Sequence, residues 1–239
     1  MKVIERLKVE DLLFIDIETV RVTDKMDEND AIKDAWLYKA RYQNEVSRKT
    51  GAELTPEEYF EDKAALYAPF AKIVCISIGR IRKDGIETKS FYGDDESMLL
   101  ELFCDTLSEI TARAKNTKLV GFNIIGFDIP FIVKRCIINR IKLPDILDQL
   151  DAKPWEVTFV DLSTIWKWSA FYPDSLVAVC AAAGIPSPKN GLDGSMVGEA
   201  YYDGRLDEIM EYCEDDVVAV ANMYLLFMRQ PFLEKISNN

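Results

Sequence analysis

The apolar run LLFIDIETV, residues 12–20, contains two carboxylates, Asp16 and Glu18. Its aliphatic and β-branched residues predict a strand over Leu12–Ile17 and just beyond. Side chains two positions apart lie on the same face of a strand, so Asp16 and Glu18 would project together. An ionised carboxylate among apolar residues is costly unless it is paired, hydrogen-bonded or bound to metal. The fold must therefore place cations or hydrogen-bond donors beside this strand. The alternative is a strand end with two solvated carboxylates, because a single D-x-E pattern is short.

Asp128 follows a second apolar run, LVGFN, which predicts a short strand ending near Asn123. Pro130 comes two residues later and is favoured in the first turn of a helix. Asp128 is therefore either a metal ligand or the N-cap of that helix, and the two roles do not exclude each other.

A fourth carboxylate, Asp216, lies in an apolar-periodic segment that predicts a helix over residues 206–228. Tyr212 is four residues earlier, so the two side chains share one helix face. Asp215 is rotated from Asp216 by roughly 100° and is expected to be a surface charge. On the alternative interpretation Tyr212 is only a half-buried aromatic.

These three motifs, taken in order, resemble those of the DEDDy branch of the 3′–5′ exonuclease superfamily. They are Asp16-Ile17-Glu18, the N-x-x-x-F-D segment from Asn123 to Asp128, and the Y-x-x-x-D segment from Tyr212 to Asp216. The likeness is greatest to the free-standing predicted exonucleases related to the proofreading domain of family-B DNA polymerases. It extends from residue 12 to about residue 228, and a charged segment near residues 26–67 matches no motif of the family.

The resemblance implies an α/β fold of the RNase H-like type, a mixed β-sheet flanked by helices. Residues 1–239 would form a single exonuclease domain with a charged, helical insertion at about 21–67. The implied activity is metal-dependent hydrolysis of phosphodiester bonds at the 3′ end of DNA, with single-stranded ends preferred.

The resemblance also implies roles for individual residues. Two Mg²⁺ or Mn²⁺ ions would be held by Asp16, Glu18, Asp128 and Asp216, with Asp16 as the bridging ligand. Asn123 and Phe127 match the positions that contact the 3′-terminal nucleotides, and Tyr212 completes the catalytic set.

The residue types agree with this chemistry. Carboxylate oxygens suit Mg²⁺ and Mn²⁺, and two ions about 4 Å apart can activate water and stabilise a leaving oxygen. The chain contains no histidine, which excludes Ser-His-Asp triads, histidine bases, histidine-ligated zinc and the sister branch with His at the Tyr212 position. Because a phenol has a pKa of about 10, we expect Tyr212 to orient the attacking water and not to act as the base.

The net charge of −12 argues against a broad nucleic-acid surface, whose phosphates attract basic residues. Part of this charge belongs to the expected metal site, where cations would offset it. Basic residues do gather at Lys134, Arg135, Arg140 and Lys142, although a solvated helix face is the more common use of such a group. We therefore expect weak, unprocessive binding to nucleic acid and a protein partner for recruitment.

Five cysteines without a C-x-x-C pair predict reduced, mostly buried thiols. The chain shows neither a signal-peptide pattern nor an apolar stretch long enough to span a membrane. These features predict a cytoplasmic protein with no membrane partner.

The remaining pattern predicts alternating strands and helices. Helices are expected near residues 30–48, 56–67, 96–114, 129–141, 175–184 and 195–202, and strands near 72–82, 85–93 and 155–163. Gly85 follows Lys83-Asp84 and indicates a hairpin turn, and Gly184 indicates a helix C-terminus. Phe171 and Tyr172 could stack on bases, but buried packing is the favoured interpretation.

Two other functions remain open. The same fold also includes exoribonucleases, and no residue here reads the 2′-hydroxyl that distinguishes RNA from DNA. A non-catalytic nucleic-acid-binding adaptor is the third possibility, and the presence of all four carboxylates and Tyr212 argues against it.

Overall fold

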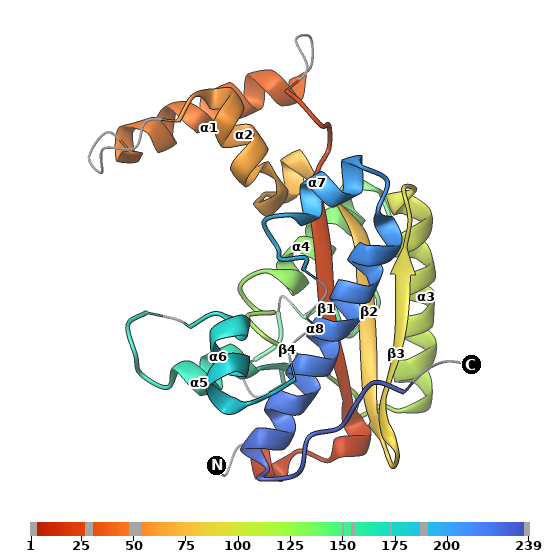
Figure 1. Cartoon of the computed structure of the whole chain (residues 1–239). Helices are drawn as coiled ribbons and strands as arrows, with labels where there is room; N and C mark the ends of the chain where they lie inside the picture. Colours follow the sequence, from red (N-terminus) through yellow and green to blue (C-terminus); the bar gives the residue numbers. More distant parts are fainter. Residues whose placement is uncertain are drawn as a thin grey trace.

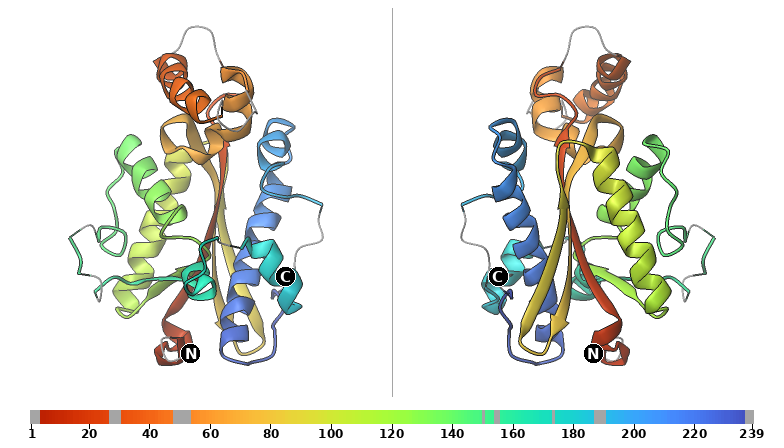
Figure 2. Two further views of the ribbon diagram at one scale, coloured as in Figure 1. Left: turned by 90° about the vertical axis from the view of Figure 1, so that its left-hand side faces the viewer. Right: turned by 90° about the vertical axis from the view of Figure 1, so that its right-hand side faces the viewer.

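The computed structural model describes residues 4–26, 31–47, 54–149, 151–153, 156–172, 174–186 and 191–236. Within these residues one mixed sheet has the strand order β3-β2-β1-β4-β5, and helices cover both of its faces (Figures 1 and 2). The strands are β1 (Leu12–Arg21), β2 (Ala71–Arg82), β3 (Gly85–Tyr92), β4 (Lys118–Gly121) and β5 (Phe159–Asp161). The helices are α1 (Ala31–Ser47), α2 (Pro56–Lys63), α3 (Glu96–Arg113), α4 (Asp128–Ile138), α5 (Leu162–Lys167), α6 (Leu176–Ala183), α7 (Val197–Tyr202) and α8 (Leu206–Phe227).

The sheet combines an antiparallel half and a parallel half around β1. β1 pairs antiparallel with β2, and β2 with β3, while β1 pairs parallel with β4, and β4 with β5. The expected hairpin is present, since Arg82 pairs with Gly85 across a two-residue turn. The central position of β1 places Asp16 and Glu18 in the middle of the molecule.

The two faces of the sheet bury different cores. One face packs against α3 and α4, with Ile15 and Phe103 fully buried there. The other face packs against α8, where Phe14 and Tyr224 are buried and their rings lie 6.0 Å apart. Successive side chains of β1 point alternately into these two cores, which is the period of two that its sequence predicts.

The charged insertion forms a small helical unit with its own core. Trp36 on α1 is fully buried against Tyr59 and Phe60 of α2, and its indole Nε1 donates to the carbonyl of Pro56 at 2.9 Å. The unit joins the sheet through the hydroxyl of Thr19, which donates to the carbonyl of Ala65 at 2.8 Å. The expected helix over 56–67 is shorter than predicted, because it ends at Lys63 and two 3₁₀ helices follow, Ala64–Leu66 and Ala68–Phe70.

Other element boundaries also differ from the prediction. β1 continues to Arg21, and the strand expected near 155–163 is confined to Phe159–Asp161. The ends of the expected 30–48 helix, Asp30 and Arg48, lie outside the described residues, as does Trp155. α5 was not expected, because six residues are too few to show helical periodicity.

The predicted C-terminus of α6 is confirmed, since Gly184 adopts a left-handed φ of 68°. All five cysteines are buried and free, as expected. In the parts of the chain that the structure describes, no helix is long and apolar enough to cross a membrane.

Candidate active site

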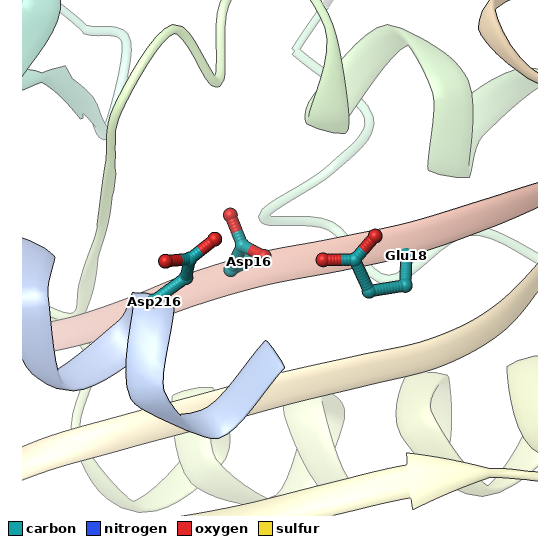
Figure 3. A group of neighbouring side chains, drawn as sticks. All are labelled: Asp16, Glu18 and Asp216. Atoms are coloured by element: carbon teal, nitrogen blue, oxygen red, sulfur yellow. The ribbon is translucent and has the colours of Figure 1, made fainter. Parts of the chain in front are cut away.

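Asp16 and Glu18 lie on the face of β1 that turns toward α8. Leu12 and Phe14 of this face are buried in the core beneath α8, and the two carboxylates continue the same alternation along the strand. Figure 3 shows both side chains projecting from β1 toward the space beside α8, from which Asp216 points back at them. Asp16 and Glu18 therefore project from the same face of β1, as their D-x-E spacing predicts, and α8 supplies the third carboxylate of the group.

The end of β4 leaves one edge of β1 open at this point. β4 pairs with β1 only from Leu12 to Phe14, so the strand has no β4 neighbour beside Asp16. A tight loop after Gly121 occupies this region. A Cβ on Gly121 would lie 1.9 Å from Cγ2 of Ile124 and 2.9 Å from the carbonyl oxygen of Ile15. Only glycine allows the chain to turn this close to β1.

Carboxylate oxygens of Asp16, Glu18 and Asp216 all lie within 4.8 Å of one another. Glu18 is buried, with 8% of its surface exposed, and the other two are half-buried. None of the ion pairs formed by the described residues includes any of the three. Three converging oxygen ligands without a protein cation fit a hard divalent ion, which supplies the charge that the site lacks.

The pKa values of the three carboxyl groups also reflect an excess of negative charge in the cluster. Burial, followed by the negative charges of Asp216, Asp128 and Glu18, raises the pKa of Asp16 well above its usual range. Burial and then the charge of Asp216 likewise raise the pKa of Glu18. Burial raises the pKa of Asp216 to about 6, against a hydrogen bond with Tyr212 that lowers it. In the absence of a cation the cluster therefore retains protons near neutral pH, and a bound divalent ion would displace them.

Asp128 lies beside this group but is not part of the set of oxygens within 4.8 Å. It is the first residue of α4 and is 4% exposed. The N-cap of α4 is Phe127, and no side chain caps this end, so the alternative that Asp128 is only an N-cap is wrong. Burial raises the pKa of Asp128 to about 7, opposed by hydrogen bonds from its own backbone and that of Ile17. Since Asp128 also raises the pKa of Asp16 and Glu18, it faces the cluster from the α4 side.

Tyr212 is 9% exposed and lies one turn before Asp216 on α8. Burial, the charges of Asp216, Glu18 and Asp16, and a hydrogen bond with Asp216 raise the pKa of its phenol well above the usual value. The phenol therefore stays protonated at physiological pH and can donate a hydrogen bond. This agrees with an orienting role and argues against a role as the base.

Asn123 and Phe127 both have structural roles in the loop before α4. Asn123 is exposed and adopts a left-handed φ of 63°, a conformation that asparagine tolerates. Its carbonyl accepts from the backbone N–H groups of Gly126 and Phe127, both at 3.0 Å. Phe127 is half-buried, and its ring centroid lies 5.3 Å from that of Phe131.

Asp161, to which the sequence assigned no catalytic role, holds this same loop. One carboxylate oxygen accepts from the backbone N–H of Asn123 at 3.0 Å, and the other accepts from that of Ile125 at 3.2 Å. The first oxygen also accepts from the N–H and hydroxyl of Ser163, at 3.0 and 2.6 Å, at the start of α5. Asp161 is 6% exposed, and its charge contributes to the raised pKa of Asp128. The sequence predicted a strand through Asp161, but it gave no sign of the loop that this carboxylate holds.

Cys213 is a second residue of the site that the sequence did not indicate. Its buried thiol lies 3.7 Å from Oδ2 of Asp16 and 3.5 Å from the carbonyl oxygen of Asp16. The hydrogen bond from the thiol lowers the pKa of Asp16, although less than burial and the neighbouring charges raise it.

Two charged residues differ from their expected settings. Arg135 is buried and donates to both carboxylate oxygens of Glu96 and to the carbonyl of Ala68, so it supports α4 and cannot contribute to a basic surface. Asp215 is half-buried and accepts from Nζ of Lys235 at 2.9 Å. It points away from the cluster, as the helix rotation predicts, but it is an ion-paired residue and not a solvated charge.

The fold is similar to that of a larger protein of known structure, the family B DNA polymerase from the hyperthermophilic archaeon Pyrobaculum calidifontis. The TM-score is 0.54 at 16% identity, over 91% of this chain and 24% of the polymerase chain. The chain thus spans about a quarter of that polymerase. The likeness confirms the expected RNase H-like fold. Among curated proteins, none matches the chain.

A match to a protein family covers residues 64–237. This region includes Asp128, Tyr212 and Asp216 but starts after β1, so the fold itself brings Asp16 and Glu18 to the matched carboxylates. The family is described as predicted 3′-5′ exonuclease related to the exonuclease domain of PolB. Because the match spans well over half of the 239 residues, the chain belongs to this family of predicted 3′–5′ exonucleases.

Proposed function

We propose that the chain is a metal-dependent exonuclease that removes nucleotides from the 3′ end of single-stranded DNA by a two-metal mechanism. The observation that carries this proposal is the group of oxygens from Asp16, Glu18 and Asp216, all within 4.8 Å of one another. Residues 1–239 act in this proposal as one exonuclease domain, with the helical insertion packed on the end of the sheet through Thr19.

In this proposal different residues of the chain bind the metal ions and contact the terminal nucleotides. Asp16, Glu18, Asp128 and Asp216 would hold two Mg²⁺ or Mn²⁺ ions, with Asp16 shared between them. Bound there, the ions would supply activation of water and stabilisation of the leaving oxygen. Asn123 and Phe127 are the proposed contacts to the terminal nucleotides, because their loop lies directly before Asp128.

Because the phenol proton of Tyr212 is shared with Asp216, its hydroxyl oxygen would accept a hydrogen bond from the attacking water and so orient it. Water attacks phosphorus, the bond from phosphorus to the 3′ oxygen breaks, and the 3′ oxygen takes up a proton. The product is a nucleoside 5′-monophosphate.

The test is degradation of a 5′-labelled DNA single strand and an RNA strand of the same sequence. We expect a ladder that shortens from the 3′ end of the DNA in Mg²⁺ or Mn²⁺, and no ladder in Ca²⁺, which prefers longer bonds and looser geometry. A strand with a blocked 3′ end should remain intact. Faster degradation of the RNA would support the exoribonuclease alternative. Undiminished hydrolysis in excess EDTA would overturn the metal mechanism, and binding without hydrolysis would support the adaptor.

We predict that Tyr212→Phe lowers the rate of hydrolysis by about 100-fold or less, the low end of the range for positioned proton donors and acceptors. The variant loses one hydrogen bond to water, while four carboxylates still bind the ions. The measurement is single-turnover cleavage at saturating Mg²⁺. Tyr224→Phe is the matched control, because Tyr224 is buried farther along the same helix. An unchanged rate in Tyr212→Phe would make Tyr212 a packing residue.

We predict that Asp161→Asn lowers kcat by up to about 100-fold, the cost of a displacement near 1 Å in a catalytic site. The amide keeps one acceptor oxygen and loses the other, so either Asn123 or Ile125 loses its backbone partner. Asp193→Asn is the matched control, because Asp193 accepts from the N–H and hydroxyl of Ser195 in a similar turn. A variant with normal kcat and a lowered Tm would show that Asp161 only caps α5.

A further inference from the structure

The loop between α5 and α6 exposes three large aromatic side chains. Trp168, Phe171 and Tyr172 are 81%, 84% and 79% exposed, the highest values among the large apolar residues that the structure describes. The rings of Phe171 and Tyr172 meet edge to face, with centroids 5.0 Å apart. The expectation that Phe171 and Tyr172 would be buried is therefore wrong. Large apolar side chains gathered and exposed on one loop are typical of a binding surface.

The fold holds this loop at both ends. The indole Nε1 of Trp166 donates to the carboxylate of Asp174 at 2.9 Å, which joins the start of the loop to its end. Trp166 is half-buried against the core under α8, and Ser175 caps α6 through the backbone N–H of Ala178 at 3.2 Å. The three exposed rings are thus presented from a loop whose ends are fixed.

The loop is anchored to the elements that build the carboxylate cluster. α5 begins at Asp161, which holds the loop before Asp128. α6 packs on α8, where Val179 and Cys180 of α6 are buried in the same core as Val217, the residue next to Asp216. Figure 1 and the left view of Figure 2 show the α5–α6 segment beside α8. A strand that leaves the cluster on the side of α6 would therefore pass the loop that carries these rings.

The negative net charge of the protein favours contacts to the bases of a nucleic acid strand over contacts to its phosphates. With a net charge of −12, phosphate contacts gain little from the overall field of the protein. Stacking of a base on an aromatic ring depends little on charge, strengthens binding by roughly 5- to 150-fold per base, and tolerates any sequence. Lys167, directly before the exposed rings, adds one cation beside them.

We propose that Trp168, Phe171 and Tyr172 form a stacking platform for unpaired bases on the 5′ side of the bond that is cut. This inference rests on the proposed nuclease function, because the cluster fixes where the 3′ end lies. Paired bases already stack within their own helix, so the platform selects single-stranded or frayed ends over blunt duplexes. A protein interface would also use such aromatics, but the continuity with the cluster favours the nucleic acid strand.

The test compares the wild type with a variant in which all three residues are changed to alanine. We expect at least a tenfold rise in KM for a 15-nucleotide single strand. The loss of kcat/KM on this strand should be at least tenfold larger than the loss on a dinucleotide, which offers only one base on the 5′ side of the bond that is cut. An aromatic-retaining variant, Trp168→Phe with Phe171→Tyr and Tyr172→Phe, should restore KM to within about threefold of the wild type.

The matched control is Met98→Ser with Leu102→Ser, because both residues are 54% exposed and lie on α3, on the opposite face of the sheet. This control should cleave both substrates like the wild type. An unchanged KM in the alanine variant would overturn the platform. An unchanged KM with loss of self-association in light scattering would overturn it in favour of contact between copies.

The platform and the proposed function can fail separately. A wild type that cleaves no oligonucleotide contradicts the nuclease proposal. Binding of the labelled 15-nucleotide strand, measured by fluorescence anisotropy, then decides the platform. Weaker binding by the alanine variant supports it, and equal binding contradicts it.

Discussion

Asp16→Asn is expected to reduce hydrolysis of a labelled single strand by roughly 10³-fold or more, because metal stabilisation of the transition state is worth several kcal/mol. Asp16 is the proposed shared ligand of both ions, and its oxygens lie in the 4.8 Å group with Glu18 and Asp216. An amide oxygen carries no full charge and cannot bridge two cations as a carboxylate does. The loss should appear in kcat at saturating Mg²⁺.

The same substitution should not destabilise the metal-free protein. The pKa of Asp16 is raised by burial and by the charges of Asp216, Asp128 and Glu18, so a neutral amide avoids the cost that ionisation of Asp16 has in the folded protein. We expect a Tm equal to or above that of the wild type in EDTA.

Asp215→Asn is the matched control, because Asp215 lies beside Asp216 on α8 but pairs with Lys235. It removes the same charge from the chain and should retain activity. Full activity in purified Asp16→Asn would contradict the proposed site, and a folded Asp16→Asn without activity would support it.

The second large expected effect is a fall in the stability of the metal-free protein as pH rises from 5 to 8. The pKa of Asp128 is raised to about 7 and that of Asp216 to about 6, from an ordinary value of 3.8, mainly by burial. The folded state therefore binds protons more tightly than the unfolded state. The stabilisation from these protons is complete below about pH 4 and is lost as pH rises through 6 to 7. One pKa unit corresponds to about 1.4 kcal/mol, so the free energy of unfolding should fall by about 4 kcal/mol between pH 5 and pH 8.

Urea unfolding in EDTA at pH 5 and pH 8 measures this effect. Mg²⁺ should raise the midpoint more at pH 8 than at pH 5, because cations bind the deprotonated carboxylates. Asp216→Asn should flatten the pH dependence, whereas Asp215→Asn should leave it nearly unchanged, although both remove one charge. A midpoint that rises between pH 5 and pH 8 in EDTA would show that the cluster is already neutralised by the protein.

Much of this architecture could be predicted from local sequence patterns. The apolar periods of β1 and α8 predicted both elements, because burial of one face imposes a period of two on a strand and about 3.6 on a helix. Gly85 and Gly184 located a hairpin turn and a helix end, since both act through the conformation of their own backbone. Short elements such as α5 lack enough residues to show any period.

The residues that could form a metal site were identifiable from local sequence patterns alone. The carboxylates Asp16, Glu18, Asp128 and Asp216 could be chosen because an ionised group within an apolar segment needs a partner, and that cost is a local property. The absence of histidine likewise excluded histidine bases, Ser-His-Asp triads and histidine-ligated zinc from the sequence alone.

The positions of these side chains relative to one another, and the residues that surround them, depend on the packing of distant segments. Asp216 joins Asp16 and Glu18 because α8 packs on the face of β1 that carries them. Asp161 holds the loop of Asn123 from 38 residues away in the chain, and Trp168, Phe171 and Tyr172 remain exposed although apolar residues are usually buried. Burial and long-range hydrogen bonds depend on which segments pack together in space. A local sequence pattern does not indicate which distant segment it will contact.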